Sequence, residues 1–353
     1  MDFLKNEVIR EDLEELHIRS IPWEKLRGKS ILITGAYGMI ASYLVFMCIY
    51  LNEEHDYGIR IIAAVRSEKK LRDRFGEYVD RDYFSVYLAS IETEIQIASK
   101  VDLIIHAAGL ASSQYHSVIP IEVMAPNVLG TMQLLRLAEE KKSESFLLFS
   151  TGEVYGKVTG QEEIDETVYG AVDTLDLRNC YCESKRLAEM FCRAWWAEKK
   201  VPARIARIAH TYGPTMDIEA DTRVFAAFVS DVIHGRDIAM DSDGSSKRPF
   251  TYIADAVAGY FTILLKGENG EAYNVCNEEE FLSIKTLAEI IAGLFPDKKI
   301  SVVRKTARNE KNATVNNIAI RNRKLRELGW NCRYDTKEGF RRTIEAMEEE
   351  RCC

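Results

Sequence analysis

The sequence lacks the features that mark several large classes of protein. No segment approaches the roughly 18 consecutive uncharged apolar residues of a membrane-spanning helix. The acidic N-terminus does not have the pattern of a signal peptide. A net charge of −8 and an isoelectric point near 5.5 argue against nucleic acid or an anionic membrane surface as the main partner. We therefore expect a soluble cytoplasmic protein that binds neither.

The sequence also lacks the usual metal-binding patterns. Its cysteines show no zinc-ligand spacing, and its histidines include no His-Glu-x-x-His pair. Cys180 and Cys182 flank a tyrosine but do not have the Cys-x-x-C spacing of a redox pair. We expect reduced thiols and no metal site.

A short apolar run followed by glycines predicts a dinucleotide site near the start of the chain. Residues 30–34 indicate a buried parallel strand, and an apolar helical run follows at 42–50. Between them, Gly35 and Gly38 allow a tight turn in which backbone N–H groups approach a pyrophosphate at the helix N-terminus. Ala41 takes the last small position of this fingerprint. The alternative is an ordinary strand–helix turn.

Strands and helices alternate along the chain, which predicts an α/β fold with a Rossmann-type doubly wound parallel sheet. We assign residues 28–212 to the dinucleotide-binding domain. Residues 213–353 are expected to form mainly a smaller α/β substrate-binding region, from which some segments return to the first domain. Residues 1–27 are a charged, partly helical extension in which we read no chemistry. The segments are strands at 30–34, 61–65, 101–106, 145–149 and 203–208, helices at 121–139, 181–198, 284–294 and 336–349, and loops around 214–222 and 241–249.

Four residues are candidates for catalysis. Tyr181 and Lys185 are spaced by one helical turn, which places a phenol and an ammonium on the same helix face. A nearby ammonium lowers the pKa of a phenol, ordinarily about 10, so that the phenolate can accept a proton from a sugar hydroxyl. Thr151, at the carboxyl end of a strand, can hydrogen-bond the same hydroxyl. Glu153 adds a carboxylate that simple alcohol oxidation does not need; its alternative role is to cap a turn.

With these motifs the chain resembles the extended short-chain dehydrogenase/reductases of the nucleotide-sugar epimerase/dehydratase family, and among them most the UDP-glucuronate decarboxylases (UDP-xylose synthases). Most of the motifs are shared by the superfamily. Three segments point to the decarboxylase branch: the sequence motif at 180–186, the Thr-x-Glu triplet at 151–153 and residues 221–224. The motifs are Thr-Gly-Ala-Tyr-Gly-Met-Ile-Ala at 34–41, His-Ala-Ala at 106–108, Asn-Val-Leu-Gly-Thr at 127–131, Thr-Gly-Glu-Val-Tyr-Gly at 151–156, Cys-Tyr-Cys-Glu-Ser-Lys-Arg at 180–186, Tyr-Gly-Pro at 212–214, Arg-Pro-Phe-Thr-Tyr at 248–252 and Leu-Gly-Trp at 328–330.

The resemblance implies that a tightly bound NAD or NADP transiently oxidises the sugar at C4 and is regenerated in each cycle. It implies that Tyr181 accepts the proton of the sugar 4-hydroxyl, while Lys185 and Thr151 hold the geometry of that step. It also implies that Glu153 handles the proton at C5 after a uronate substrate has lost CO2. The substrate contacts that it implies are Tyr115, His210, Arg223 and Arg248. The cofactor contacts that it implies are Gly35, Tyr37, Gly38, Met39, Ile40, Arg66, Ser67, Ser90, Ile91, Ala107, Ala108, Gly109, Tyr181 and Lys185.

Four positions depart from the pattern of this family. Gly152 replaces the serine usual in the decarboxylases and the aspartate usual in dTDP-glucose dehydratases. His210 stands where an asparagine usually contacts the substrate, and a histidine at a strand end is more often structural. Ser90 takes the place of an aspartate that meets the adenine, and Arg66 follows the second strand where NAD-preferring members carry an aspartate. For Arg248, the alternative is a surface arginine.

Several functions remain open on the sequence. The leading one is decarboxylation of UDP-glucuronate or a related nucleotide uronate. A nucleotide-sugar 4,6-dehydratase needs an acid for the leaving 6-hydroxyl, and Gly152 removes the usual one, whereas a 4-epimerase leaves Glu153 unexplained. An inactive, cofactor-sensing regulatory protein is expected to have lost Tyr181 or Lys185, and both are present.

Two further expectations concern the cofactor and the assembly. Arg66 and the adjacent Ser67 can donate charge-assisted hydrogen bonds to a 2′-phosphate, which favours NADP over NAD; the alternative is a solvated arginine. A homodimer is expected because similar enzymes build a four-helix interface from the helices at 121–139 and 181–198. These helices carry apolar residues at helical spacing, although packing on the sheet alone explains them equally; they include Leu134, Leu135, Met190 and Trp195.

Overall fold

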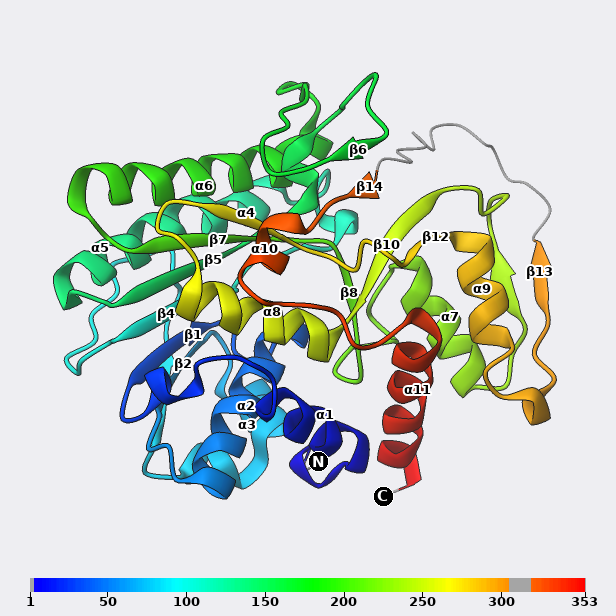
Figure 1. The fold of residues 1–353 in the computed structure, drawn as a ribbon, viewed down its shortest axis with the longest axis horizontal. Coiled ribbons are helices and arrows are strands. Elements are labelled where there is room, and N and C mark those ends of the chain that lie inside the picture. Colours follow the sequence, from blue (N-terminus) through cyan, green and yellow to red (C-terminus); the bar gives the residue numbers. More distant parts are fainter. Residues whose placement is uncertain (1–2, 305–318, 353) are drawn as a thin grey trace.

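The computed structural model describes residues 3–304 and 319–352, and its centre is a seven-stranded parallel sheet (Figure 1). The strand order is β11-β7-β5-β4-β1-β2-β3. The chain thus starts in the middle, fills one edge and then crosses to the other, which confirms the predicted doubly wound fold. The strands are β1 (Ser30–Thr34), β2 (Arg60–Val65), β3 (Phe84–Leu88), β4 (Leu103–His106), β5 (Ser145–Thr151), β7 (Ala203–Ile208) and β11 (Ala272–Val275).

Helices cover both faces of this sheet because its strands are apolar on both sides. In β1, Ile31 and Ile33 join one core cluster, whereas Leu32 between them joins the cluster on the opposite face. The first face carries α2 (Met39–His55), α3 (Glu68–Phe75) and α8 (Ile253–Lys266). The second carries α5 (Thr131–Lys141) and α6 (Cys180–Lys199), drawn above the sheet in Figure 1.

The helix expected at 121–139 is interrupted. It consists of α4 (Pro120–Ala125), a π-helical turn η5 (Pro126–Gly130) and then α5. Pro126 has no backbone N–H, so the regular helical hydrogen bond is missing at that position and a wider turn takes its place.

A smaller group of elements, most of which follow β7 in the chain, lies beside this sheet. The three-stranded sheet β12-β10-β8 contains β10 next to β8 in parallel and β12 in antiparallel pairing. The expected loop at 241–249 is wrong for residues 247–249, because these begin β10 and pair with β12. The elements are β8 (His210–Tyr212), α7 (Val224–Ile233), β9 (Ile238–Met240), β10 (Lys247–Tyr252), β12 (Phe281–Ser283), α9 (Ile284–Ala292), β13 (Val302–Arg304), β14 (Ala319–Ile320), α10 (Arg323–Glu327) and α11 (Thr336–Cys352), with β14 pairing β6 (Glu163–Ile164).

Two segments beyond residue 213 belong spatially to the first sheet. Strand β11 pairs with β7 at its edge, and α8 packs on β5 and β7. The division of the chain at residue 213 stays a prediction, and α8 and β11 are the segments that cross it. Among the helices described in residues 3–304 and 319–352, none combines the length and the apolar composition needed to cross a membrane.

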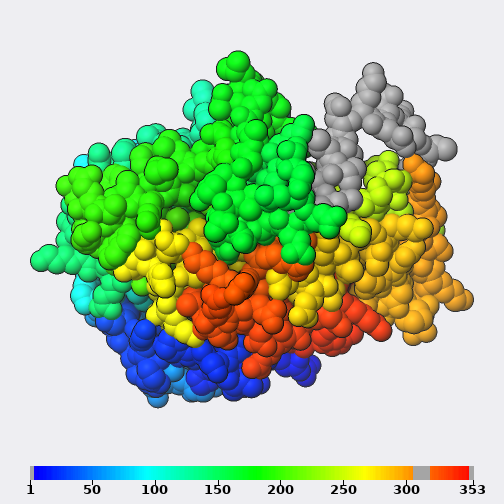
Figure 2. Space-filling view, turned by 45° about the horizontal axis from the view of Figure 1, so that its top comes forward, coloured from blue at the N-terminus to red at the C-terminus, as the bar shows by residue number. Residues whose placement is uncertain are grey.

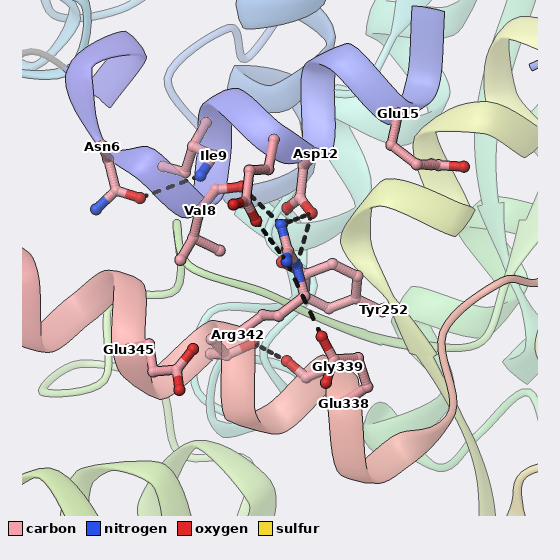
Figure 3. Close-up of polar contacts among 12 residues, drawn as sticks. Asn6, Val8, Ile9, Asp12, Glu15, Tyr252, Glu338, Gly339, Arg342 and Glu345 are labelled. Atoms are coloured by element: carbon pink, nitrogen blue, oxygen red, sulfur yellow. Dashed lines mark hydrogen bonds and ion pairs between the residues drawn. The ribbon is translucent and has the colours of Figure 1, made fainter. Parts of the chain in front are cut away.

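The N-terminal extension forms α1 (Glu7–His17), which packs against α11, α8 and α2. Buried Asp12 accepts hydrogen bonds from Tyr43 (2.8 Å) and Tyr252 (2.6 Å) and pairs with Arg342 (2.9 Å; Figure 3). The Asn6 side chain caps α1 and donates to the carbonyl of Ala346 (3.0 Å). The first residues are therefore an integral part of the fold, and Figure 2 shows them directly beneath the C-terminal segments on one face.

Candidate active site

Strand β5 and helix α6 bring three of the four catalytic candidates into one cluster. Thr151 is the last residue of β5, Glu153 lies in the following turn η6 (Gly152–Tyr155), and Tyr181 is the second residue of α6. The hydroxyl of Thr151 accepts a hydrogen bond from the backbone N–H of Glu153 (3.2 Å) and shares one with the Tyr181 hydroxyl. By itself this second hydrogen bond acts to lower the Tyr181 pKa, against larger effects that raise it. These three side chains are thus held at the carboxyl edge of the sheet, as predicted.

Lys185 completes the group from one turn further along α6. Its side chain is buried, and Nζ donates to the carbonyl of Phe149 on β5 (2.7 Å) and lies 5.8 Å from the centroid of the Tyr181 ring. Burial lowers the pKa of Lys185 to about 8, and Glu189 acts in the opposite direction. The ammonium is therefore fixed between the strand and the tyrosine.

The pKa of Tyr181 differs from the sequence expectation. We expected a lowered pKa because of Lys185, but the protein groups raise it, through burial first and then the Glu153 carboxylate. Glu153 is exposed as a residue, but desolvation of its carboxyl group raises the pKa of that group against an opposing effect of Arg178. Tyr181 and Glu153 are therefore two protonatable groups in close electrostatic contact.

A buried ion-paired network behind this cluster was missed from the sequence. Glu189, one turn beyond Lys185, binds Arg207 of β7 (2.8 Å), and Ser150 Oγ donates to the same carboxylate (2.5 Å). The Arg207 guanidinium also lies 4.9 Å from the centroid of the Tyr155 ring. The sequence places Glu189 one helical turn from Lys185, but it does not indicate that Arg207, from a separate strand, is the partner of Glu189.

The turn after β1 has the shape of a pyrophosphate cradle. Gly35 has φ +64°, and a Cβ there would lie 2.9 Å from the Cα of Ala108. Gly38 begins α2 in an extended conformation without a side-chain cap, so the first N–H groups of the helix are left for a ligand. A side chain at Gly35 would therefore collide with the end of β4, and the free N–H groups at the start of α2 fit the pyrophosphate of a dinucleotide. Tyr37, Met39 and Ile40 are half-buried around the same turn.

The end of β4 is fixed against this turn. Thr34 Oγ1 accepts the backbone N–H groups of Ala107 (3.1 Å) and Ala108 (3.0 Å) and lies 3.0 Å from Nδ1 of buried His106. Burial lowers the pKa of His106 to about 3, so this ring is a neutral structural group. Beyond Ala108, Gly109 faces the buried Oδ1 of Asn127, which has no hydrogen-bond partner among the described residues.

The residues expected at the adenosine end of the cofactor lie after β2 and β3. Arg66 is exposed, and Ser67 caps α3 by accepting the N–H of Lys70 (3.3 Å). Ser90 Oγ accepts the N–H of Glu92 (3.4 Å). Ile91 is buried, with its side chain directed at Gly130.

The structure brings together three of the four predicted substrate contacts. His210 lies on β8, edge-on to the rings of Phe225 and Phe250, and burial with the charges of Arg248 and Arg223 lowers its pKa to about 3. Arg223 pairs with Asp221 (2.5 Å), donates to Thr211 O (3.3 Å) and lies 3.4 Å from Met39 Sδ.

Arg223 therefore touches the dinucleotide turn as well as the substrate side. Arg248 on β10 is half-buried. The fourth predicted contact, Tyr115, is 37% exposed in the turn η4 (Ser113–Tyr115).

Gly152, one of the departures from the family pattern, has a structural partner. A Cβ at this position would lie 3.1 Å from Cδ1 of Ile320 in β14. An aliphatic side chain thus occupies the space next to Gly152 that a serine or aspartate side chain would enter.

Comparisons with known proteins agree with this fold and site. The model of the NAD dependent epimerase/dehydratase family matches residues 31–276. UDP-glucuronic acid decarboxylase 6 of Arabidopsis thaliana is 30% identical over 91% of this chain and 88% of its own length. The dTDP-D-glucose 4,6-dehydratase of Homo sapiens is 28% identical over 93% of both chains. The solved structure of UDP-glucose 4-epimerase from Thermotoga maritima with UDP-glucose has a TM-score of 0.78 at 22% identity, covering 91% of this chain and 99% of that one, which shows a shared fold.

Proposed function

The chain belongs to the NAD dependent epimerase/dehydratase family, and from that premise we propose that it decarboxylates UDP-glucuronate or a related nucleotide uronate. Its family and relatives are NAD-dependent enzymes that modify nucleotide sugars, and this class of activity applies to the chain as a whole. The choice of reaction within the class is our proposal. The observation that carries it is the surroundings of Glu153.

The neighbourhood of Glu153 disfavours a dehydratase. Dehydration needs an acid that protonates the leaving 6-hydroxyl. Position 152 supplies no side chain, and Ile320 lies against it, so an apolar group stands where such an acid is expected. Decarboxylation has no leaving hydroxyl and does not need this acid.

Glu153 itself disfavours an epimerase. Epimerisation at C4 requires no carboxyl group at this position, whereas loss of CO2 requires a proton at C5 afterwards. A carboxyl group with a raised pKa, next to Tyr181, is suited to hold and deliver that proton. The presence of both Tyr181 and Lys185 in one cluster also argues against an inactive regulatory protein.

The two arginines near His210 suit an anionic substrate. The positive charges of both guanidinium groups lower the pKa of His210, so both lie near this ring. The planar, forked guanidinium of an arginine can hydrogen-bond a carboxylate or a phosphate through two N–H groups. We assign Arg248 to the uronate carboxylate or a phosphate, and Arg223 and Tyr115 to the remainder of the nucleotide sugar. His210 stays neutral and provides an aromatic, uncharged wall.

The residues at the turn after β1 would hold the cofactor. When bound, the cofactor would accept a hydride from C4 of the sugar and later give it back. Tyr181 takes the proton of the sugar 4-hydroxyl, with Thr151 hydrogen-bonded to it and Lys185 fixed behind its ring. A ketone at C4 makes the uronate a β-keto acid, so CO2 can leave while the electrons remain delocalised. Glu153 then directs a proton to C5.

We propose that the cofactor site also accommodates the 2′-phosphate of NADP. Arg66 is exposed immediately after β2, where the ribose of a bound dinucleotide lies, and Lys69 and Lys70 follow in the first turn of α3. The hydroxyl of Ser67 accepts from the helix and still has its own proton to donate. These groups place positive charge after β2, and the position that selects NAD when it is acidic carries Arg66.

We further propose that the protein is a homodimer built on α4, η5 and α6. Of the residues that supported this expectation in the sequence, Leu134 and Leu135 are fully buried within the monomer, whereas Met190 is 62% exposed. Further large apolar side chains of α4, η5 and α6 are exposed: Ile121 (72%), Leu129 (43%) and Leu187 (42%). Light scattering is expected to give a mass near twice 40.3 kDa, and a monomer at all micromolar concentrations contradicts the proposal.

The reaction is tested by incubating the purified protein with UDP-glucuronate, UDP-glucose and dTDP-glucose and weighing the products by mass spectrometry. We expect UDP-glucuronate to lose the mass of CO2. Loss of the mass of water from a hexose nucleotide supports a dehydratase, and a changed sugar with unchanged mass supports an epimerase. Either result contradicts the proposal.

A further inference from the structure

A histidine ring lies flat against Tyr181. The ring centroids of His116 and Tyr181 are 5.0 Å apart, and the ring planes differ by 17°. His116 directly follows η4, and Tyr181 stands in the first turn of α6. A second contact joins the same two segments, because Cys180 Sγ donates to the carbonyl oxygen of His116 (3.3 Å). The loop before α4 therefore contacts the start of α6 twice, through the His116 ring on Tyr181 and through the His116 carbonyl on Cys180.

The His116 ring is buried and uncharged. It is only 2% exposed, and burial together with the charge of Arg178 lowers its pKa. The backbone of Ala111 and of Arg178 interacts with the ring nitrogens and opposes this lowering, although Nε2 has no partner at good hydrogen-bond geometry among the described residues. The neighbouring backbone therefore helps to hold the ring while its flat face lies against Tyr181.

Tyr181 is held by apolar side chains as well as by His116. Val123, Leu110 and Met124 form a small apolar cluster with Tyr181, separate from the two large cores. The groups that act on the tyrosine hydroxyl are Thr151, Glu153 and Cys182, while the Lys185 ammonium is 5.8 Å from the ring. The hydroxyl oxygen lies on the long axis of the ring, so it is displaced only when the whole ring tilts. A flat neighbour stacked on the ring face opposes that tilt.

We propose that His116 is a positioning residue for Tyr181, whose imidazole ring packs on one face of the phenol and prevents the tilt that would carry its hydroxyl away from Thr151 and the substrate. This inference rests on the proposed role of Tyr181 as the acid–base group. The essential property of His116 is a flat aromatic face. Neither nitrogen exchanges a proton with the substrate.

The first test measures turnover of the nucleotide sugar that the wild-type protein accepts. His116→Ala removes the stacked ring and is expected to lower kcat by up to ~10²-fold, the effect of misplacing a reacting group by about an ångström, while KM changes little. His116→Phe restores a flat ring without nitrogen and is expected to return kcat to near the wild-type value. His116→Leu, which fills space without a flat face and protects against a collapse of the loop, is expected to behave like the alanine variant.

The second test observes the tyrosine directly and needs no substrate. In a sample labelled with ¹³C in the tyrosine rings, the signal that disappears in Tyr181→Phe belongs to Tyr181. That signal is expected to broaden in the alanine and leucine variants and to stay narrow in the phenylalanine variant. Thermal unfolding of each variant checks that the fold is retained.

The outcomes separate this inference from the proposed function. An unchanged Tyr181 signal in His116→Ala overturns the positioning role, and so does a phenylalanine variant as inactive as the alanine variant, which would assign the role to a ring nitrogen. If wild-type protein turns over none of the three nucleotide sugars, or if Tyr181→Phe is fully active, the proposed function fails. The NMR result then decides the inference about His116 by itself.

Discussion

Glu189 and Arg207 form a buried, two-pronged ion pair behind the catalytic cluster. Arg207 Nε lies 3.1 Å from Oε1 of Glu189, and Nη2 lies 2.8 Å from Oε2. The side chains are only 12% and 7% exposed. Since Glu189 stands one turn from Lys185, this pair fixes the catalytic helix α6 on strand β7.

Replacing Arg207 with methionine should destabilise the protein strongly. The substitution leaves the Glu189 carboxylate buried without its countercharge, which typically costs about 3–5 kcal/mol. Urea unfolding monitored by fluorescence measures this loss. The matched control is Arg193→Met, which breaks the exposed pair with Glu271 and should cost less than about 1 kcal/mol. Equal effects in the two variants would mean that the buried pair has no special weight.

Replacing Tyr181 with phenylalanine should reduce turnover by the ~10²–10⁴-fold that follows the loss of a positioned acid–base group. Binding of the nucleotide sugar, measured by calorimetry, should change little because the aromatic ring remains. Tyr169→Phe serves as the control, since that side chain is 76% exposed. Near-normal turnover in Tyr181→Phe would remove this residue from its proposed role.

Replacing Glu153 with glutamine should stop the reaction after oxidation of the sugar. The amide is similar in size but cannot deliver a proton to C5, whereas hydride transfer does not involve this side chain. Reduced nicotinamide should accumulate in absorbance measurements, or a 4-keto product should be released. Normal turnover in this variant would weaken both the decarboxylase and the dehydratase assignments and favour an epimerase.

Replacing Arg66 with aspartate should reverse the choice of cofactor. A charge-assisted hydrogen bond contributes about 1.5–3 kcal/mol, so its loss corresponds to roughly 10- to 100-fold weaker binding of NADP. The new carboxylate can instead accept hydrogen bonds from the ribose hydroxyls of NAD. Denaturation of the purified protein and chromatography of the released nucleotide identify the occupant. NAD as the sole nucleotide of the wild-type protein would contradict the proposed phosphate pocket.

The stability of the protein should carry a pH dependence that originates at Asp12. Burial raises the pKa of Asp12 to about 6, compared with an ordinary value of 3.8. The folded state therefore holds the proton more tightly, and the associated stability is complete below pH 3.8 and is lost as the pH rises through 6, by roughly 3 kcal/mol in total.

An Asp12→Asn variant has no such titration. The stability of wild type relative to this variant should fall between pH 4 and pH 7 in urea unfolding experiments. Glu14→Gln, which changes an exposed carboxylate of the same helix, is the control and should show no comparable slope. A constant difference between wild type and Asp12→Asn across this range would rule out the raised pKa.

The sequence was informative where function depends on local spacing. Tyr181 and Lys185 share a helix turn, and Thr151 ends a strand, so their proximity followed from regular geometry. His116 and Tyr181 are brought together by the fold from separate segments with no periodic signal. Helix α8 was missed because it is buried on all sides and shows no polar face. The role of Asp12 in residues 1–27 could not be predicted because two of its three side-chain partners, Tyr252 and Arg342, lie 240 and 330 positions away.

The pairing of α1 with α11 has a consequence for how the protein is made. Arg342 is synthesised 330 residues after Asp12. At about 5–20 residues per second, α1 waits on the order of tens of seconds for α11. During this interval the apolar side of α1, with Ile9, Leu13 and Leu16, lacks the helix that later covers it. The native packing of α1 can be completed only after α11 has been released, so chaperones that shield nascent chains have an early target in residues 7–17.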